Sequence, residues 1–165
     1  MNPPADARKQ IVVGVADMAV SDDVGTELVT YSLGSCLGVV IYDPMRHIGG
    51  LLHSMLPDSS IREDRKSPDM FVDTGMPRLI AAACRLGADK KRLVVKVVGG
   101  ARVLDDNNYF RIGERNYEAL RQTLLENGLQ VGGEQVGGEV SRSVRLEIAT
   151  GKVQVTIPGQ PPVFI

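Results

Sequence analysis

Apolar and polar residues alternate most regularly near the C-terminal end of the chain. Every second residue from Val144 to Ile148 is apolar, and the same alternation returns from Val153 to Ile157. A period of two is typical of strands with one buried face. Thr150-Gly151 lies between the two segments and suits a tight turn. The pattern therefore predicts a β-hairpin in this region.

The first third of the chain contains short apolar segments separated by turn residues. Their apolar and β-branched content predicts strands. The predicted strands cover Ile11–Val20, Glu27–Ser32, Leu37–Tyr42 and Ile48–Met55. The predicted turns lie at Ser21–Gly25, Leu33–Cys36 and Asp43-Pro44. We expect these strands to form a meander of three or four members.

Two segments in the middle of the chain show the spacing of amphipathic helices. The first begins near Thr74 to Pro77 and ends at Gly87, and its apolar stripe is Leu79, Ile80, Ala83 and Leu86. The second runs from about Glu114 to Asn127, and its stripe is Tyr117, Leu120, Leu124 and Leu125. Further strands are predicted at Leu93–Val98, after the first helix, and at Leu129–Val136, after the second.

The order of the predicted elements indicates the fold class. Strands come first, helices lie among strands in the middle, and a hairpin comes last, which predicts an α/β or α+β layered sandwich. The sheet should be mixed, because hairpins and helical crossovers both occur, and the two helices should cover one side of it. A chain of 165 residues suits one domain. We assign residues 1–10 to a flexible N-terminal tail, 11–158 to a single domain and 159–165 to a C-terminal tail.

Composition and charge narrow the classes of function. With 19 basic and 20 acidic residues the net charge is -1, which gives no electrostatic case for a nucleic-acid partner. No segment resembles a signal peptide or reaches the roughly 20 apolar residues that cross a bilayer, so membrane insertion is not expected. Two cysteines without an export signal favour free thiols and a cytoplasmic location, although counting alone allows a Cys36–Cys84 disulfide.

One cysteine and one histidine lie in glycine-rich, otherwise apolar sequence. Cys36 ends the segment Leu33-Gly34-Ser35-Cys36, and His53 follows it by 17 residues. An imidazole can take the proton of a thiol that attacks a carbonyl carbon, and can then protonate the leaving group. Thr30 precedes Cys36 by six residues, and its hydroxyl or carbonyl oxygen can accept the imidazole N–H. Backbone N–H groups at Gly34, Ser35 and Leu37 are candidate oxyanion donors.

Each of these residues also has a structural interpretation. A lone cysteine in an apolar segment is most often a core side chain, and threonine is common in strands. A lone histidine among strand residues is often a hydrogen-bonded core group. The absence of CxxC, HxxxH and clustered carboxylates nearby argues against a metal site. On residue types alone, catalysis and packing both remain open.

Seven short blocks of sequence carry a family resemblance when they are taken in order. The blocks are Thr30 to Cys36, His53 to Pro57, Asp73–Pro77, Lys96–Ala101, Ile112–Asn116, Val136–Gly138 and Thr150–Val153. Each block is weak alone, but the ordered set is specific. Over roughly residues 11 to 157 the chain resembles the CheD family of chemoreceptor glutamine deamidases.

The resemblance implies a fold, an activity and site residues. The implied fold is a layered sandwich related to the catalytic domain of cytotoxic necrotizing factor toxins. The implied activity hydrolyses glutamine side chains on chemoreceptor helices to glutamate, and in some members also glutamyl methyl esters. Cys36 would be the nucleophile, His53 the general base and acid, and Thr30 the residue that orients His53. No cofactor is implied, and in some species the family binds the phosphatase CheC.

Three further expectations follow. Gln135 stands near a position that is usually acidic in the family, beside Gly137-Gly138. The polar segment from Asp58 to Ser67 is predicted to line or flank a shallow substrate groove, or to be a plain solvated loop. Two other functions remain open: a binding module that regulates CheC, with catalysis secondary, and a thiol hydrolase of small amides.

Overall fold

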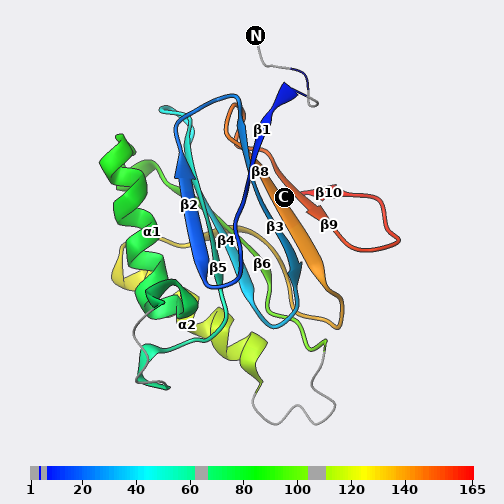
Figure 1. Ribbon diagram of the computed structural model, residues 1–165. Helices are drawn as coiled ribbons and strands as arrows, with labels where there is room; N and C mark the ends of the chain where they lie inside the picture. Colours follow the sequence, from blue (N-terminus) through cyan, green and yellow to red (C-terminus); the bar gives the residue numbers. More distant parts are fainter. Residues whose placement is uncertain (1–3, 5–6, 62–66, 104–110) are drawn as a thin grey trace.

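The structure is a computed structural model that describes residues 4, 7–61, 67–103 and 111–165, and it contains two sheets and two helices (Figure 1). The first sheet has the spatial order β1 (Lys9–Val12), β3 (Thr26–Leu33), β8 (Arg142–Glu147), β9 (Val153–Thr156), β10 (Val163–Phe164). The second sheet has the order β2 (Asp17–Ser21), β5 (Ile48–Ser54), β4 (Leu37–Asp43), β6 (Val94–Gly99), β7 (Val131–Val136). The helices are α1 (Val72–Leu86) and α2 (Ile112–Glu126), and short 3₁₀ turns lie at Ser59–Ile61, Pro68–Met70 and Lys90–Arg92.

The elements form three layers. Both helices cover one side of the second sheet, and the first sheet covers its other side (Figure 1). One core cluster, including Val39 and Leu79, lies between the helices and the second sheet. The other, including Val40 and Leu146, lies between the sheets. The second sheet is therefore buried on both faces, and every residue of β4 and β5 is buried.

The predicted mixed sandwich with helices on one side is confirmed. β1 pairs with β3 and β6 pairs with β7 in parallel, and the remaining pairs are antiparallel. The C-terminal hairpin is confirmed as β8 and β9, in which Val144 lies opposite Val155 and Leu146 opposite Val153. Its alternating side chains supply part of the core between the sheets.

The meander predicted for the first third of the chain is wrong. The single strand expected from Ile11 to Val20 is two strands, and β1 and β2 belong to different sheets. The chain changes sheets around Ala16, whose φ of 59° is in the left-handed region. It changes sheets again between β3 and β4, so the turn that ends at Cys36 joins two layers. An apolar, β-branched run predicts a strand but does not say which sheet it joins.

The ends of the chain contain strand residues beyond the boundaries at 11 and 158. β1 begins at Lys9, and Arg8 forms ion pairs of 3.0 Å with Glu27 and with Glu147. Near the other end, Val163 lies opposite Val155 on β9. Main-chain pairing with neighbouring strands thus includes residues that composition alone assigns to the tails.

Both helices form where the apolar spacing places them, with differences in detail. α1 begins earlier than predicted, at Val72, so Pro77 lies beyond its first turn. On α2, Leu120 and Leu124 are buried, whereas Leu125 is 66% exposed and does not belong to the buried stripe. Neither helix in the described ranges is long and apolar enough to cross a membrane.

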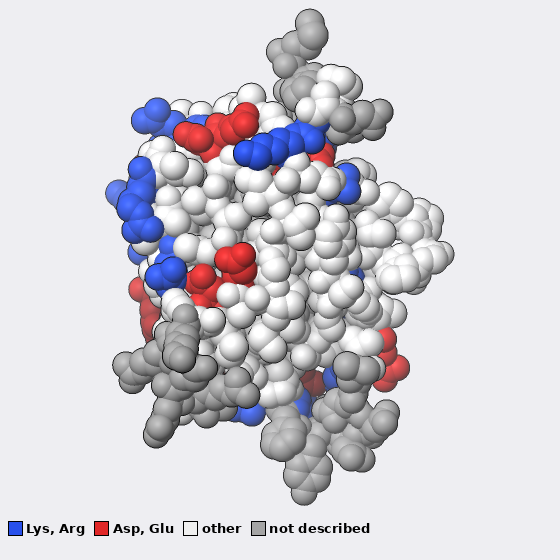
Figure 2. Space-filling view, viewed as in Figure 1, with Lys and Arg blue, Asp and Glu red and all other residues white. Residues whose placement is uncertain are grey.

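Charged side chains of both signs are interspersed on the face shown in Figure 2. Basic and acidic groups lie mainly toward its borders, and few lie over its middle. The uncovered part of this face has no extended basic area. Its electrostatics therefore favour neither a polyanion nor a polycation.

Candidate active site

Cys36 lies in the turn that carries the chain from β3 to β4. Three successive carbonyl oxygens of this turn accept hydrogen bonds from other segments. Ala101 N donates to Gly34 O at 2.9 Å, Asn116 Nδ2 to Ser35 O at 2.9 Å, and Gly100 N to Cys36 O at 2.9 Å. These bonds fix the orientation of the peptide planes before Cys36 and at Cys36 itself.

Two glycines permit the close packing around this turn. A Cβ on Gly99, whose φ is 113°, would lie 2.2 Å from Cys36 O. A Cβ on Gly113, at the start of α2, would lie 2.4 Å from Gly100 O. Any side chain at either position would push apart backbone segments that lie in contact. The glycine-rich blocks therefore serve close approach of the main chain.

His53 is held by Thr30 across the gap between the two sheets. Thr30 Oγ1 lies 2.7 Å from His53 Nδ1 and donates its own proton to Val13 O at 2.7 Å. A hydroxyl has one proton, so the bond to His53 must be donated by Nδ1–H. The neutral ring then carries its lone pair on Nε2, the nitrogen that a general base uses. Nε2 is buried and has no hydrogen-bond partner among the described residues.

The strand register brings Cys36 and His53 to the same end of the layer between the sheets. His53 lies opposite Gly38 on β4, two residues after Cys36. Cys36 is partly exposed and packs against the cluster between the sheets, the layer in which His53 meets Thr30. No hydrogen bond joins Cys36 Sγ to His53 Nε2 in the described structure, and such bonds often tighten only with substrate.

Burial keeps both groups neutral. Desolvation raises the pKa of the Cys36 thiol and lowers the pKa of the His53 ring. Thr30 orients the ring without a negative charge that would favour the imidazolium. Both shifts favour the neutral forms, a thiol at Cys36 and an imidazole at His53.

The candidate oxyanion donors divide into two kinds. Gly34 and Ser35 lie in the turn, and their N–H groups donate to no group in the described part of the chain. Leu37 lies within β4, in register with both Ser54 and Gly99. The N–H of a residue paired on both sides points toward a neighbouring strand. The N–H groups of the turn are the more available set.

The two cysteines are free thiols, and they lie on opposite faces of the second sheet. Cys84 packs with the cluster between the helices and this sheet, and Cys36 packs with the cluster between the sheets. The Cys36–Cys84 disulfide that counting allowed is not formed. In the described ranges, no group of three or more His, Cys, Asp or Glu residues is placed to hold a metal ion.

Gln135 forms part of a partly buried polar contact near the site. Its Oε1 accepts from Arg142 Nε at 3.1 Å, and Arg142 Nη1 donates to Gly137 O at 2.8 Å. A neutral amide thus occupies the position that the family resemblance leads us to expect as acidic. Through Arg142, this position supports the main chain around Gly137.

The polar segment from Asp58 to Ser67 is described only in part, because residues 62–66 lie outside the described ranges. Its first turn is tied to α1: Ser59 N and Ser59 Oγ donate to Asp73 at 3.0 and 2.9 Å. The prediction that this segment lines a substrate groove stays a prediction.

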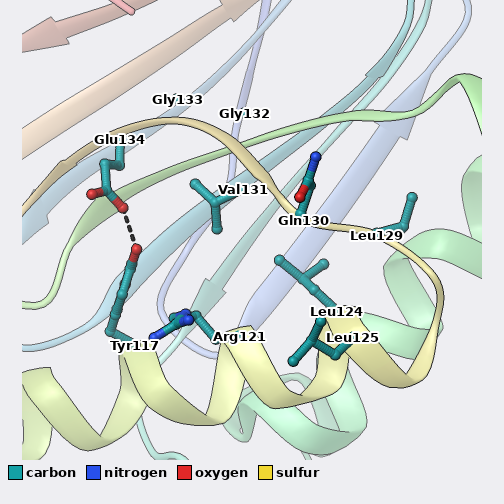
Figure 3. Close-up of a pocket in the computed structure, with 10 residues that line it drawn as sticks. All are labelled: Tyr117, Arg121, Leu124, Leu125, Leu129, Gln130, Val131, Gly132, Gly133 and Glu134. Carbon is teal, nitrogen blue, oxygen red and sulfur yellow. Dashed lines mark hydrogen bonds between the residues drawn. The ribbon is translucent and has the colours of Figure 1, made fainter.

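A separate groove of about 520 Å³ lies between α2 and β7 (Figure 3). Tyr117 on α2 donates a hydrogen bond to Glu134 on β7 across one part of it, and the exposed Leu125 lines it near the other end of the helix. None of the predicted catalytic residues lines this groove. The candidate chemistry therefore lies in the turn region, outside this hollow.

Sequence reasoning missed two groups of the site. Val13 O accepts from Thr30, but a backbone carbonyl on a distant segment has no sequence signature. Asn116 binds the turn through its side chain. It lies in the block Ile112–Asn116, which resembled the family, but the resemblance gave it no role.

We expect Thr30→Val to lower kcat by about 10- to 100-fold, because the ring loses the acceptor that fixes its tautomer. The change also leaves His53 Nδ1–H and Val13 O unpaired in the interior, at a cost of about 1–3 kcal/mol for each buried group. Thr30→Ser keeps the hydroxyl and should retain most activity. Steady-state kinetics and thermal unfolding of both variants check this, and equal loss in both would contradict the hydroxyl's role.

The acid limb of the activity profile should lie below the ordinary histidine range of about pH 6.5, because burial lowers the pKa of His53. If the neutral ring is the base, activity should persist until that lower pKa is reached. The same shift links pH to stability. Below about pH 6.5 the unfolded chain binds the proton first, so this part of the stability is lost as pH falls toward the folded pKa.

The measurement is kcat/KM and the unfolding midpoint between about pH 4.5 and 8, for wild type and His53→Gln. Asp17 lies opposite His53 on β2, but it is exposed, and its carboxylate accepts from Met18 N. An acid limb centred above the ordinary histidine range would contradict the neutral pair.

Two curated relatives are similar over most of the chain. The probable chemoreceptor glutamine deamidase CheD 1 of Syntrophus aciditrophicus is 51% identical over 153 residues, which cover 92% of this chain and 96% of that protein. The probable chemoreceptor glutamine deamidase CheD of Solibacter usitatus is 50% identical over 147 residues, which cover 88% and 87%. An alignment over 92% of this chain necessarily includes residues 30 to 53.

Among solved structures, the chain is similar to Neisseria meningitidis protein NMB0706, with a TM-score of 0.48, 13% identity, and coverage of 79% of this chain and 63% of that one. This likeness carries no argument about function. The family described as CheD chemotactic sensory transduction matches residues 55–157, which is more than half of the chain. With relatives about half identical over most of their own length, the chain belongs to the CheD family.

Proposed function

We propose that the chain is a cytoplasmic protein-glutamine deamidase that converts glutamine side chains of chemoreceptor helices to glutamate and releases ammonia. The names of its curated relatives, chemoreceptor glutamine deamidases, support this substrate class. The observation that carries the proposal is the His53 ring, which Thr30 holds with Nε2 unpaired at the end of the layer that contains Cys36. A buried imidazole with a fixed tautomer and a free lone pair is poised to accept a proton.

The reaction begins with attack of Cys36 Sγ on the glutamine side-chain carbonyl carbon, while His53 Nε2 takes the thiol proton. The carbonyl oxygen becomes an oxyanion, which N–H groups of the Gly34–Cys36 turn can stabilise. The tetrahedral intermediate collapses, the C–N bond breaks, and the imidazolium gives its proton to the leaving nitrogen, which departs as ammonia. A thioester between Cys36 and the glutamyl carbonyl remains.

Hydrolysis of the thioester regenerates the site. Neutral His53 takes a proton from water, and the resulting hydroxide equivalent attacks the thioester carbon. The C–S bond breaks, the thiol recovers its proton and glutamate is released. The same steps hydrolyse a glutamyl methyl ester, with methanol as the leaving group. We therefore propose methylesterase activity as a second use of the site.

The family resemblance adds two further proposals. One is kinship of the fold with the catalytic domain of cytotoxic necrotizing factor toxins, which deamidate a glutamine in small GTPases. The other is binding of CheC. If binding were the main role, loss of catalysis would leave that interaction intact.

The test of the proposed function is mass spectrometry of a glutamine-bearing cytoplasmic receptor fragment after incubation with the protein. Each deamidated site should gain about 1 Da as an amide becomes a carboxyl, with one equivalent of ammonia released. Free glutamine at the same concentration is the control substrate. Turnover of free glutamine without turnover of the fragment would instead show a hydrolase of small amides.

A further inference from the structure

Asn116 connects the two backbone segments that carry the candidate catalytic pair. It lies on α2 and is fully buried. Its Nδ2 donates to Ser35 O at 2.9 Å and to Met55 O at 3.0 Å. Ser35 immediately precedes Cys36, and Met55 follows His53 by two residues. One side-chain amide therefore ties together the ends of the nucleophile turn and the histidine strand.

The orientation of the Asn116 amide follows from its partners. Both nearby acceptors are carbonyl oxygens, so the nitrogen must face them. The opposite flip would bring Oδ1 against both oxygens. Oδ1 itself is buried and has no partner among the described residues, so the position tolerates an unpaired acceptor to keep the two donated bonds. In the same ranges, neither Ser35 O nor Met55 O has another hydrogen bond.

The helix that carries Asn116 is itself held against the site. Gly113, one turn earlier on the same face of α2, packs so closely on Gly100 that a Cβ would lie 2.4 Å from Gly100 O. Gly100 N in turn holds Cys36 O at 2.9 Å. The start of α2 thus fixes two successive peptides of the turn: Asn116 binds the Ser35–Cys36 peptide, and Gly100, held against Gly113, binds the Cys36–Leu37 peptide.

We propose that Asn116 is a positioning residue that sets the separation of Cys36 Sγ from His53 Nε2. The inference rests on the proposed function of that pair. The two protons of one planar NH₂ group diverge at a fixed angle, so the oxygens they bind are held in a fixed relation. Thr30 fixes which nitrogen of the ring is free, and Asn116 fixes how far the thiol is from it.

The test compares Asn116→Asp and Asn116→Ala with Thr123→Val. Aspartate keeps the shape of asparagine but has no N–H to donate, and alanine is the smaller variant that accommodates repacking. Thr123 is the matched control: it is buried on the same helix, and its hydroxyl bonds only within α2, to Ala119 O at 2.8 Å. Thr123→Val removes one buried hydrogen bond without touching either site segment.

The first readout needs no substrate. The rate at which iodoacetamide alkylates Cys36 at pH 7 is followed by mass spectrometry of the peptide that contains it, which separates it from Cys84. We expect both Asn116 variants to slow alkylation about tenfold, and Thr123→Val to leave it within twofold. In a His53→Ala background the Asn116 changes should have no further effect, because their influence passes through the alignment of the pair.

The second readout is the separate measurement of kcat and KM with the receptor fragment as substrate. Misplacement of reacting groups by about 1 Å can cost about 100-fold. We expect kcat to fall between about 10- and 100-fold with KM within twofold of wild type. If Asn116 served stability alone, its variants would be alkylated at Cys36 and would turn over substrate like Thr123→Val. Any change in the alkylation rate that they did cause would be the same with or without His53. Either result would overturn the proposal.

The two readouts separate this inference from the proposed function. If wild type shows His53-dependent alkylation that Asn116 controls, but leaves the receptor fragment unchanged, the positioning role holds and the assigned substrate fails. If the fragment is deamidated with normal kcat by both Asn116 variants, the function holds and the positioning role fails.

Discussion

Cys36→Ala should lose deamidation of the receptor fragment by at least about 10⁴-fold, to the level of the reaction without enzyme. The proposed mechanism passes through a bond between Sγ and the glutamyl carbon, and alanine provides no atom to form it. Loss of a covalent nucleophile removes the whole catalytic unit, because the base then has nothing to activate. The measurement is the 1 Da shift per site, followed by mass spectrometry over a time course for both proteins.

Cys84→Ala is the matched control for this experiment. Cys84 is the other free thiol, and it lies on the helix side of the second sheet. Its replacement should leave the rate within about twofold, since it removes a thiol without touching the layer of His53. A mass shift that proceeds equally with Cys36→Ala and wild type would end the assignment of Cys36 as the nucleophile. If the protein binds CheC as proposed, a Cys36→Ala protein that keeps this binding would separate it from catalysis.

The sequence was most informative where rare residue types stood in unusual surroundings. Cys36 and His53 stood out because reactive side chains are scarce in this chain and because glycine surrounded them. Thr30 precedes Cys36 by six residues and was a candidate acceptor for the imidazole N–H, and its Oγ1 lies 2.7 Å from His53 Nδ1. The alternation around Val144 and Val153 gave the hairpin, because a period of two depends only on which face is buried.

Groups that contact the site from segments far apart in the sequence could not be found in this way. Val13 O and Asn116 join the site because β1, α2 and the nucleophile turn meet in space, and no local pattern encodes that meeting. The division of the Ile11–Val20 run into two strands has the same origin, since either half suits either sheet. Pairing between distant strands determines which sheet each strand joins, whereas the local sequence pattern determines where helices and strands form.

The site draws its rigidity from strands that have no free face. β4 and β5 are covered by helices on one side and by the first sheet on the other, so the histidine strand cannot shift without disturbing both cores. The thiol lies in the turn that connects the two sheets, so its position depends on how the layers are held together. Contacts far from Cys36 that hold β4 in place are therefore expected to matter for the whole molecule.

Asp43, at the far end of β4, is such a contact, and Asp43→Ala should lower the free energy of unfolding by about 3–5 kcal/mol. The Asp43 side chain is fully buried, with Arg92 Nε 3.1 Å from Oδ1 and Nη2 2.9 Å from Oδ2. Backbone N–H groups also donate to it, including Asp89 N at 2.8 Å. Alanine would leave the Arg92 guanidinium and these N–H groups without their acceptor.

The pH dependence of this loss follows from the pKa of Asp43. Burial alone would raise that pKa, but the hydrogen bonds from Arg92 and from backbone N–H groups outweigh it and lower the pKa far below the usual value. A depressed carboxyl pKa contributes stability that is present above the unfolded value of about 3.9 and is lost as pH falls toward the folded pKa. The gap between wild type and Asp43→Ala should therefore be widest above about pH 4 and should narrow in stronger acid.

Urea unfolding at pH 7 and at about pH 3 measures the loss of unfolding free energy and its dependence on pH. Asp22→Ala is the matched control. Asp22 is exposed and makes no ion pair among the described residues, so its removal should change stability by no more than about 0.5 kcal/mol at either pH. A loss below about 1 kcal/mol for Asp43→Ala at pH 7, or a loss independent of pH, would show that water replaces the ion pair. In that case the far end of β4 would be held by apolar packing alone.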